Sequence, residues 1–209
     1  MEKSEYYTAI RDDIIEMVPD GVRRILEVGC GAGFTGRAIK ENRKGPIEVT
    51  GIEIEAKVAE KAKENIDRVM VGNVETMELP FEKGYFDCII YGDVLEHLVD
   101  PWNILIRHCG FLKKNGYVVM SIPNIAHYRT IKMLCRKEWN YEDRGILDKN
   151  HLRFFALNNI KEMLRNADLG IVRIKHKLSG SKSKKILNKV LCGALSDYLT
   201  EQYIILARN

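Results

Sequence analysis

The N-terminal part of the sequence holds a glycine-rich turn between two acidic residues. A short apolar run at 25–28 contains Glu27, and glycine then occupies every second position of residues 29–33. A second apolar run, 49–52, ends at Glu53. This pattern is typical of a buried parallel strand, a turn without Cβ atoms that lets a ligand approach the backbone, and an acid that bonds a ribose. These residues predict a site for an adenosine-containing cofactor.

Two short patterns leave a hydride-transfer enzyme open as an alternative. Residues 31–36 spell Gly-x-Gly-x-x-Gly, the fingerprint of dinucleotide-binding folds. Tyr128 and Lys132 spell the Tyr-x-x-x-Lys of short-chain dehydrogenases, although the glycine spacing of those enzymes differs and Tyr128 follows Ser121 too closely. An NAD(P)-dependent reductase that uses Tyr128 and Lys132 is therefore our second hypothesis. A cofactor-binding module without turnover is the third.

The charge of Glu27 distinguishes between the two cofactors. A pyrophosphate prefers a helix N-terminus, and a neighbouring carboxylate would repel it. A sulfonium and an α-amino group are cationic, so a carboxylate at the tip of the first strand favours them. Glu27 therefore indicates S-adenosylmethionine rather than NAD.

Four blocks of the chain resemble the motifs of class I S-adenosylmethionine-dependent methyltransferases. They are Ile25–Gly33, Gly51–Ile54, Val71–Glu75 and Phe86–Leu98. A further block, Leu147–Phe155, is similar to the His-Leu-Arg-Phe-Phe segment of a bacterial small-molecule subgroup. That subgroup occurs beside or fused to glycosyltransferases and is related to quinone and sugar O-methyltransferases. The resemblance covers most of the chain, and beyond Phe155 only the rhythm of the elements matches.

The resemblance implies S-adenosylmethionine as cofactor and S-adenosylhomocysteine as product. Glu53 would bond the ribose, Ile54 would contact adenine, and Asn73, which replaces the usual aspartate, would bond the adenine amino group. A helix at the N-terminus would cap the pocket. The full predicted cofactor site comprises Tyr7, Arg11, Glu27, Gly29, Cys30, Gly31, Gly33, Glu53, Ile54, Asn73, Val74, Gly92, Asp93 and Val94.

Three histidines are candidates for a catalytic base. Methyl transfer from a sulfonium is an in-line displacement, and a hydroxyl nucleophile benefits from a base that titrates near neutral pH. His97 follows the expected cofactor loop, His127 follows the end of a strand, and His151 lies in a segment expected to cover the site. We expect the mid-helix His108 to lie on the surface. The acceptor that this chemistry suits is a small molecule with a hydroxyl, such as a sugar, quinone or phenol.

The apolar pattern alternates between short strands and helices, which predicts an α/β fold with a doubly wound parallel sheet. The family resemblance implies a Rossmann-like seven-stranded sheet of order 3-2-1-4-5-7-6 with an antiparallel last strand. The predicted strands are 25–28, 48–52, 69–71, 85–91, 117–122, 171–177 and 202–207. The predicted helices are 4–18, 34–42, 55–68, 101–112, 158–166 and 184–198.

The length of 209 residues suits a single methyltransferase domain, 1–209, with the cap helix 4–18 and a substrate-side insertion at 124–151. The five dispersed cysteines favour a cytoplasmic protein without disulfides, and their spacing and that of the histidines predict no metal site. With a net charge of +4, no base-flipping motif and no apolar run of roughly 18 residues, we expect no nucleic-acid partner and no stable membrane insertion. A homodimer and the role of the basic segment 175–189 stay open.

Overall fold

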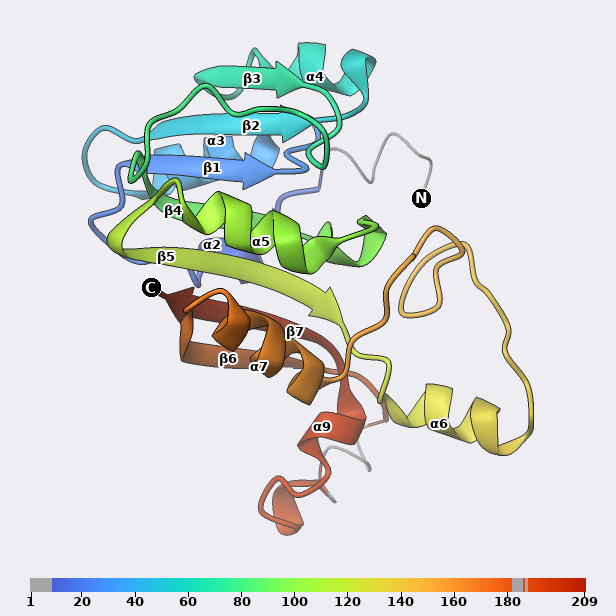
Figure 1. Cartoon of the computed structure of the whole chain (residues 1–209). Coiled ribbons are helices and arrows are strands. Elements are labelled where there is room, and N and C mark those ends of the chain that lie inside the picture. Colours follow the sequence, from blue (N-terminus) through green and yellow to red (C-terminus); the bar gives the residue numbers. More distant parts are fainter. Residues whose placement is uncertain (1–8, 182–185, 187) are drawn as a thin grey trace.

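The structure is a computed structural model that describes residues 9–181, 186 and 188–209 (Figure 1). Its centre is a seven-stranded sheet with the order β3-β2-β1-β4-β5-β7-β6. Strand β7 pairs antiparallel with both β5 and β6, whereas the pairs among the first five strands are parallel. This confirms the predicted fold class, strand order and antiparallel last strand. The strands are β1 (Arg24–Val28), β2 (Glu48–Glu53), β3 (Arg68–Val71), β4 (Phe86–Gly92), β5 (Leu112–Pro123), β6 (Gly170–Leu178) and β7 (Thr200–Arg208).

Helices cover both faces of the sheet (Figure 1). One face packs against α2 (Asp12–Ile15), α3 (Phe34–Asn42) and α4 (Ala56–Ala62) through a continuous apolar cluster. The other face packs against α5 (Pro101–Cys109) and α7 (Leu157–Asn166) through a second cluster. Strand β4 contributes to both clusters, which explains why its sequence is apolar at nearly every position.

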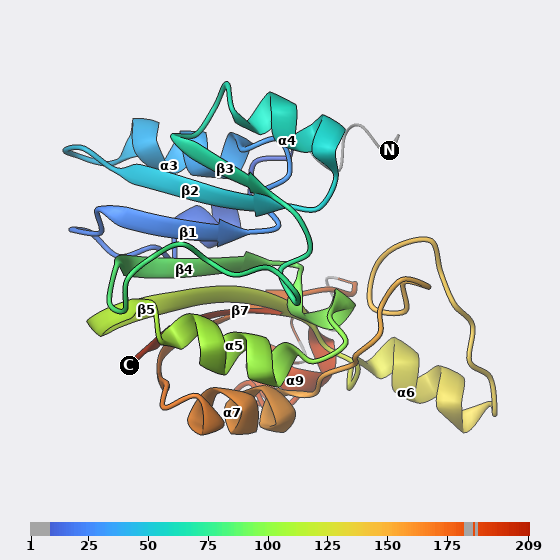
Figure 2. The same cartoon turned by 45° about the horizontal axis from the view of Figure 1, so that its top comes forward.

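The carboxyl ends of β1, β2 and β4 meet at one edge of the sheet, because these strands are parallel and adjacent (Figure 2). Ligands of open α/β sheets bind at this edge. The loops that follow the three strands contain most of the predicted cofactor residues. The fold therefore brings together segments that lie more than 60 residues apart in the sequence.

Four predicted helices are shorter in the structure or fall partly outside its described residues; one of them, 101–112, ends at Cys109, and Leu112 already belongs to β5. The described part of the cap helix 4–18 is helical only in α2, which begins where Asp12 and Asp13 favour a helix N-terminus; Tyr7 lies outside the described residues. The predicted helix 55–68 ends at Ala62, after which Asn65 donates from its amide to the carbonyl oxygen of Ala32 at 2.8 Å. The predicted helix 184–198 is described only in part and finishes with α9 (Ser196–Leu199).

Segment 124–151 is less irregular than the sequence indicated, because it contains α6 (Tyr128–Cys135). Helix α6 projects beyond the body of the molecule, and of its side chains only Thr130 is buried (Figures 1 and 2). In the part of the chain that the structure describes, no helix has the length and apolar character needed to cross a membrane.

His108 is buried, so the expected surface position is wrong. Its Nδ1 lies 2.8 Å from the hydroxyl oxygen of Tyr91 on β4. Burial lowers the pKa of this histidine to about 4, because the charged form loses its hydration. His108 is therefore a neutral core residue in the layer between α5 and the sheet.

Candidate active site

The glycine turn after β1 lies directly against the loop after β4. Gly29, Gly31 and Gly33 all have left-handed backbones, with φ of +69°, +54° and +79°. A Cβ atom built on Gly29 would lie 2.5 Å from Cγ2 of Val94, a distance that no side chain tolerates. The backbone N–H groups of Gly29 and Cys30 donate to the carbonyl oxygen of Ile52. The hydrogen bonds therefore fix the turn to β2, and the turn lies close to Val94 in the loop after β4.

Glu53 at the end of β2 connects two of these loops. One carboxylate oxygen accepts the N–H of Gly31 at 2.9 Å, and the other accepts the N–H of Glu55 at 3.0 Å. The next side chain, Ile54, is 64% exposed at the same edge. The acid is thus held by the glycine turn, and an exposed apolar side chain lies beside it. The predicted contacts of Glu53 with the ribose and of Ile54 with adenine stay predictions.

Glu27 lies deeper than the sequence indicated. Its side chain is buried between β1 and α3, where the backbone N–H of Gly36 donates to it. Burial raises the pKa of this carboxyl to about 8, and among the described residues its Oε2 has no hydrogen-bond partner. The predicted contact of Glu27 with a cationic cofactor stays a prediction.

The loop after β3 offers a polar and an apolar residue. Asn73 is exposed, and its Oδ1 accepts the N–H of Glu75 at 2.9 Å, which fixes an Asx turn. The side chain of Val74 is buried. The predicted adenine contacts of Asn73 and Val74 stay predictions.

Asp93 is the centre of a polar network after Gly92 at the end of β4. Its backbone is left-handed, with φ of +57°. Its carboxylate accepts hydrogen bonds from the guanidinium of Arg11, the hydroxyl of Ser121 and the amide of Gln202. Arg11 was predicted to pair with the cofactor; here it forms ion pairs with Asp93 and Asp13 instead. The network fastens the N-terminal segment to the edge of the sheet.

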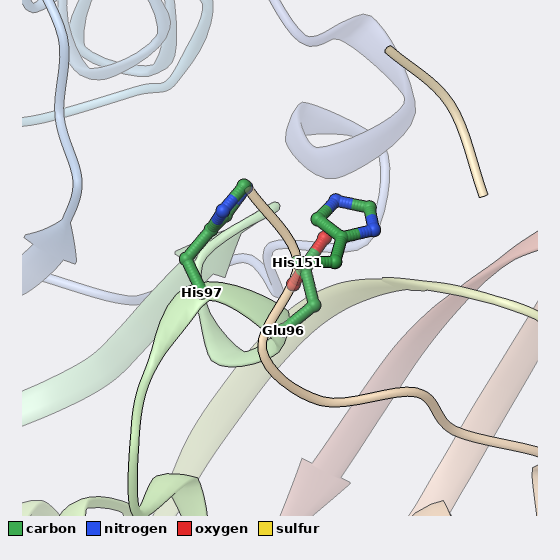
Figure 3. Close-up of side chains that lie close together, drawn as sticks. All are labelled: Glu96, His97 and His151. Atoms are coloured by element: carbon green, nitrogen blue, oxygen red, sulfur yellow. The ribbon is translucent and has the colours of Figure 1, made fainter. Parts of the chain in front are cut away.

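Glu96, His97 and His151 come together beside this network (Figure 3). The first two residues lie on a short 3-10 helix, Leu95–His97, and His151 reaches them from a segment 54 residues further along. The candidate ligand atoms of all three side chains lie within 4.8 Å of one another. We name these residues the Glu-His-His cluster. The spacing of the histidines in the sequence did not predict this arrangement, because the two segments meet only in the folded chain.

Backbone contacts hold the Glu-His-His cluster in place. The N–H groups of Leu152 and Arg153 donate to the carbonyl oxygen of Glu96 at 2.8 and 3.0 Å. Each imidazole Nδ1 lies 3.1 Å from a backbone carbonyl oxygen, that of Asn150 for His97 and that of Ile146 for His151. A carbonyl can only accept, so each Nδ1 donates and the neutral ring keeps Nε2 unprotonated. Burial also lowers the pKa of His151.

His127 does not join the other two histidines. It is buried at the N-cap of α6, where its Nδ1 accepts the N–H of Arg129, and its Nε2 lies 2.9 Å from the hydroxyl of Ser179. These contacts engage both ring nitrogens and indicate a structural role at the start of α6. The predicted base at position 127 therefore gains no support from its surroundings.

A family model described as a methyltransferase domain matches residues 3–174. The chain belongs to this methyltransferase family. This membership and the fold make the chain a methyltransferase domain of the kind that uses S-adenosylmethionine. The reductase hypothesis loses its support, because Tyr128 and Lys132 lie on the projecting α6 and the cofactor is not a nicotinamide.

Curated relatives of the methyltransferase share moderate identity with it. The 27-O-demethylrifamycin SV methyltransferase of Amycolatopsis mediterranei (strain S699) is 29% identical over 124 residues, which cover 56% of this chain and 45% of the relative. The ubiquinone biosynthesis O-methyltransferase of Shewanella sp. (strain ANA-3) is 23% identical over 167 residues, covering 77% and 70%. The match thus spans less than half the length of the first relative.

Solved structures share the fold of the methyltransferase. An S-adenosylmethionine-dependent methyltransferase from Archaeoglobus fulgidus superimposes with a TM-score of 0.66 at 19% identity, covering 99% of this chain and 94% of that one. At this identity the likeness concerns the fold alone.

Proposed function

We propose that this methyltransferase transfers the methyl group of S-adenosylmethionine to a hydroxyl oxygen of a small molecule. The acceptor oxygen loses its proton and bonds to the methyl carbon, while the S–C bond breaks and its electron pair stays on sulfur. The products are a methyl ether, S-adenosylhomocysteine and one proton. The protein has to align the acceptor, exclude water and take up the proton.

The Glu-His-His cluster is the observation that carries this proposal. The backbone fixes the tautomers of His97 and His151, so Nε2 is the nitrogen that accepts a proton in the neutral form of both rings. The cluster follows Val94, which packs against Gly29 of the glycine turn, so proton acceptors lie next to the expected cofactor site. A hydroxyl nucleophile needs such groups more than an amine, whose free base is already nucleophilic.

The cofactor in this proposal occupies the carboxyl edge of β1, β2 and β4. Glu53 bonds the ribose, Ile54 packs against adenine, and Asn73 bonds the adenine edge. The glycine turn leaves room for the methionine part, and Asp93 holds the adjacent loop through its network with Arg11.

The acceptor class is proposed from the aromatic side chains around His151. The ring of Phe154 lies 6.2 Å from that of His151 and 5.5 Å from that of Trp139, which in turn lies 6.2 Å from Tyr141. Trp139 and Tyr141 are exposed. Such a surface suits a flat phenol or hydroquinone, or a stacked sugar. The names of the two curated relatives above also refer to methylation of oxygen.

The experiment compares matched acceptors in the presence of tritiated S-adenosylmethionine. We expect a methyl ether from catechol or hydroquinone and no transfer to the corresponding aromatic amines. His151→Asn should lower kcat by about 100-fold, because it removes a proton acceptor. His176→Asn, a histidine outside the cluster, should not change it. Transfer to amines alone, or equal rates in the wild type and His151→Asn, would contradict the proposal. Cofactor binding without any methylated product would favour the module without turnover.

A further inference from the structure

The carboxylate of Glu96 is a buried acid that lacks partners. The residue is 1% exposed, and within the described part of the chain neither oxygen accepts a hydrogen bond. Buried polar groups in folded proteins are nearly always hydrogen-bonded, and each exception needs an explanation such as an ion or a functional role. Glu96 therefore points to a ligand that the protein alone does not supply.

The two histidines next to Glu96 have the outer contacts of metal ligands. A histidine that binds a metal through one ring nitrogen commonly donates the other N–H to a carboxylate or a backbone carbonyl. His97 and His151 both do so, toward Asn150 and Ile146. Figure 3 shows Glu96 and His97 on the same short helix, with His151 meeting them from the other segment.

Asp93, the other acid beside the cluster, is not available as a metal ligand. Asp93 is already neutralised by Arg11 and also accepts from Ser121 and Gln202. A dication bound by the cluster would be held by the ionised form of Glu96 and by one nitrogen of each imidazole. It would then meet a single compensating negative charge and would keep positions open for another ligand.

We propose that Glu96, His97 and His151 bind one divalent first-row transition metal ion. Two imidazole nitrogens and one carboxylate oxygen suit Zn²⁺, Co²⁺ or Mn²⁺ better than Ca²⁺ or Mg²⁺, which take oxygen ligands. Metal–nitrogen bonds of about 2.0 Å place tetrahedral ligand atoms about 3.3 Å apart. The ligand atoms now lie within 4.8 Å of one another, so binding would require them to approach by up to about 1.5 Å.

The ion would also refine the acceptor class, and this second step rests on the proposed function. A bound dication lowers the pKa of a coordinated hydroxyl, as zinc lowers that of water from 15.7 to about 7. An acceptor with two adjacent oxygens, such as a catechol or a vicinal diol, fills two open positions at once. The ion would then align one oxygen with the methyl group and favour its deprotonation. As ligands, His97 and His151 would act through the ion rather than take up the proton themselves.

Electron paramagnetic resonance with Mn²⁺ tests the site without any acceptor. Mn²⁺ is the appropriate probe because exposed Cys135 and Cys192 could capture the softer Zn²⁺. After treatment with a chelator, the full chain should bind one Mn²⁺ ion, seen as loss of the signal of free Mn²⁺. Glu96→Gln and His151→Asn should each weaken binding by at least about 100-fold, whereas His176→Asn should bind like the wild type.

The outcomes separate the metal site from the proposed function. Absence of Mn²⁺ binding, or equal binding in the wild type and both cluster variants, overturns the site. Thermal melts and S-adenosylhomocysteine binding establish that each variant is folded. If catechol is methylated at full rate after the chelator treatment, the role of the ion in aligning the acceptor falls and hydroxyl methylation stands. If Mn²⁺ binds at the cluster but no hydroxyl compound is methylated, the site stands and the proposed function falls.

Discussion

At the scale of single residues, the enclosed carboxyl of Glu27 makes stability depend on pH. Its pKa rises from an ordinary 4.5 to about 8 through burial, so the folded protein keeps a proton that the unfolded chain loses. The unfolded state therefore binds fewer protons between these values, and stability falls as the pH rises through that window. The free energy of unfolding of the protein therefore depends on pH through the proton on Glu27.

Glu27→Gln should remove this dependence, because the amide resembles the protonated acid and cannot ionise. Relative to the wild type, the variant should gain on the order of 4 kcal/mol in free energy of unfolding from pH 4.5 to 8. Urea denaturation at several pH values measures the difference. A difference that stays constant over the window would show that the carboxyl ionises without cost.

Gly29 tests the close contact between the glycine turn and the loop after β4. Gly29→Ala combines a left-handed backbone with a Cβ atom 2.5 Å from Val94, so we expect a loss of about 2–3 kcal/mol in stability and weaker cofactor binding. Gly21→Ala is the matched control, since Gly21 has φ of +83° and no atom near the added Cβ. It should cost about 1 kcal/mol and leave cofactor binding unchanged. Equal effects of the two substitutions would show that the contact with Val94 is unimportant.

The sequence could identify residues whose role follows from local pattern, and it missed those whose role depends on long-range contacts. The glycines, Glu53 and Ile54 stand at strand ends where a short pattern predicts them. The proximity of Glu96 and His151 cannot be predicted from either local segment, because the two side chains come close only in the folded chain. Arg11 was expected near the cofactor. Its ion pair with Asp93 could not be predicted from the sequence either, because the two residues lie 82 positions apart.

At the scale of elements, strands were easier to predict than helices. Strand β4 is buried on both faces, so its continuous apolar run defines it well. Helix α6 was missed because its outward faces are polar or exposed and little of it meets a core. The early end of α4 was missed because the side chain of Asn65 bonds the distant Ala32, a contact that propensity does not include.

The segment between α6 and α7 is predicted to determine acceptor affinity through Trp139. This side chain is 38% exposed and packs edge-to-face against Phe154, so Trp139→Ala should cost little stability. It should raise KM for an aromatic acceptor by about 10-fold, with kcat changed much less, because it removes a stacking surface and no reacting group. Steady-state kinetics with catechol test this. Tyr198→Ala, an exposed aromatic residue on α9, is the control. An unchanged KM in Trp139→Ala would exclude the segment from acceptor binding.

At the scale of the whole molecule, the sheet order is what places the site. The parallel strands β2, β1 and β4 end at one edge, so Glu53, the glycine turn and Asp93 become neighbours. The alternation of strands and helices predicted the parallel sheet. The position of β7 between β5 and β6 came from the family resemblance alone, because an antiparallel insertion leaves no mark in the hydrophobic pattern.

Calorimetric titration with S-adenosylhomocysteine tests the central claim most directly, namely that this edge is the cofactor site. We predict one site with micromolar affinity in the wild type. Glu53→Ala should weaken binding at least about 10-fold because it removes the proposed ribose contact, while Glu55→Ala, its exposed neighbour, should bind normally. Absence of binding to the wild type, or equal binding to Glu53→Ala, would contradict the account.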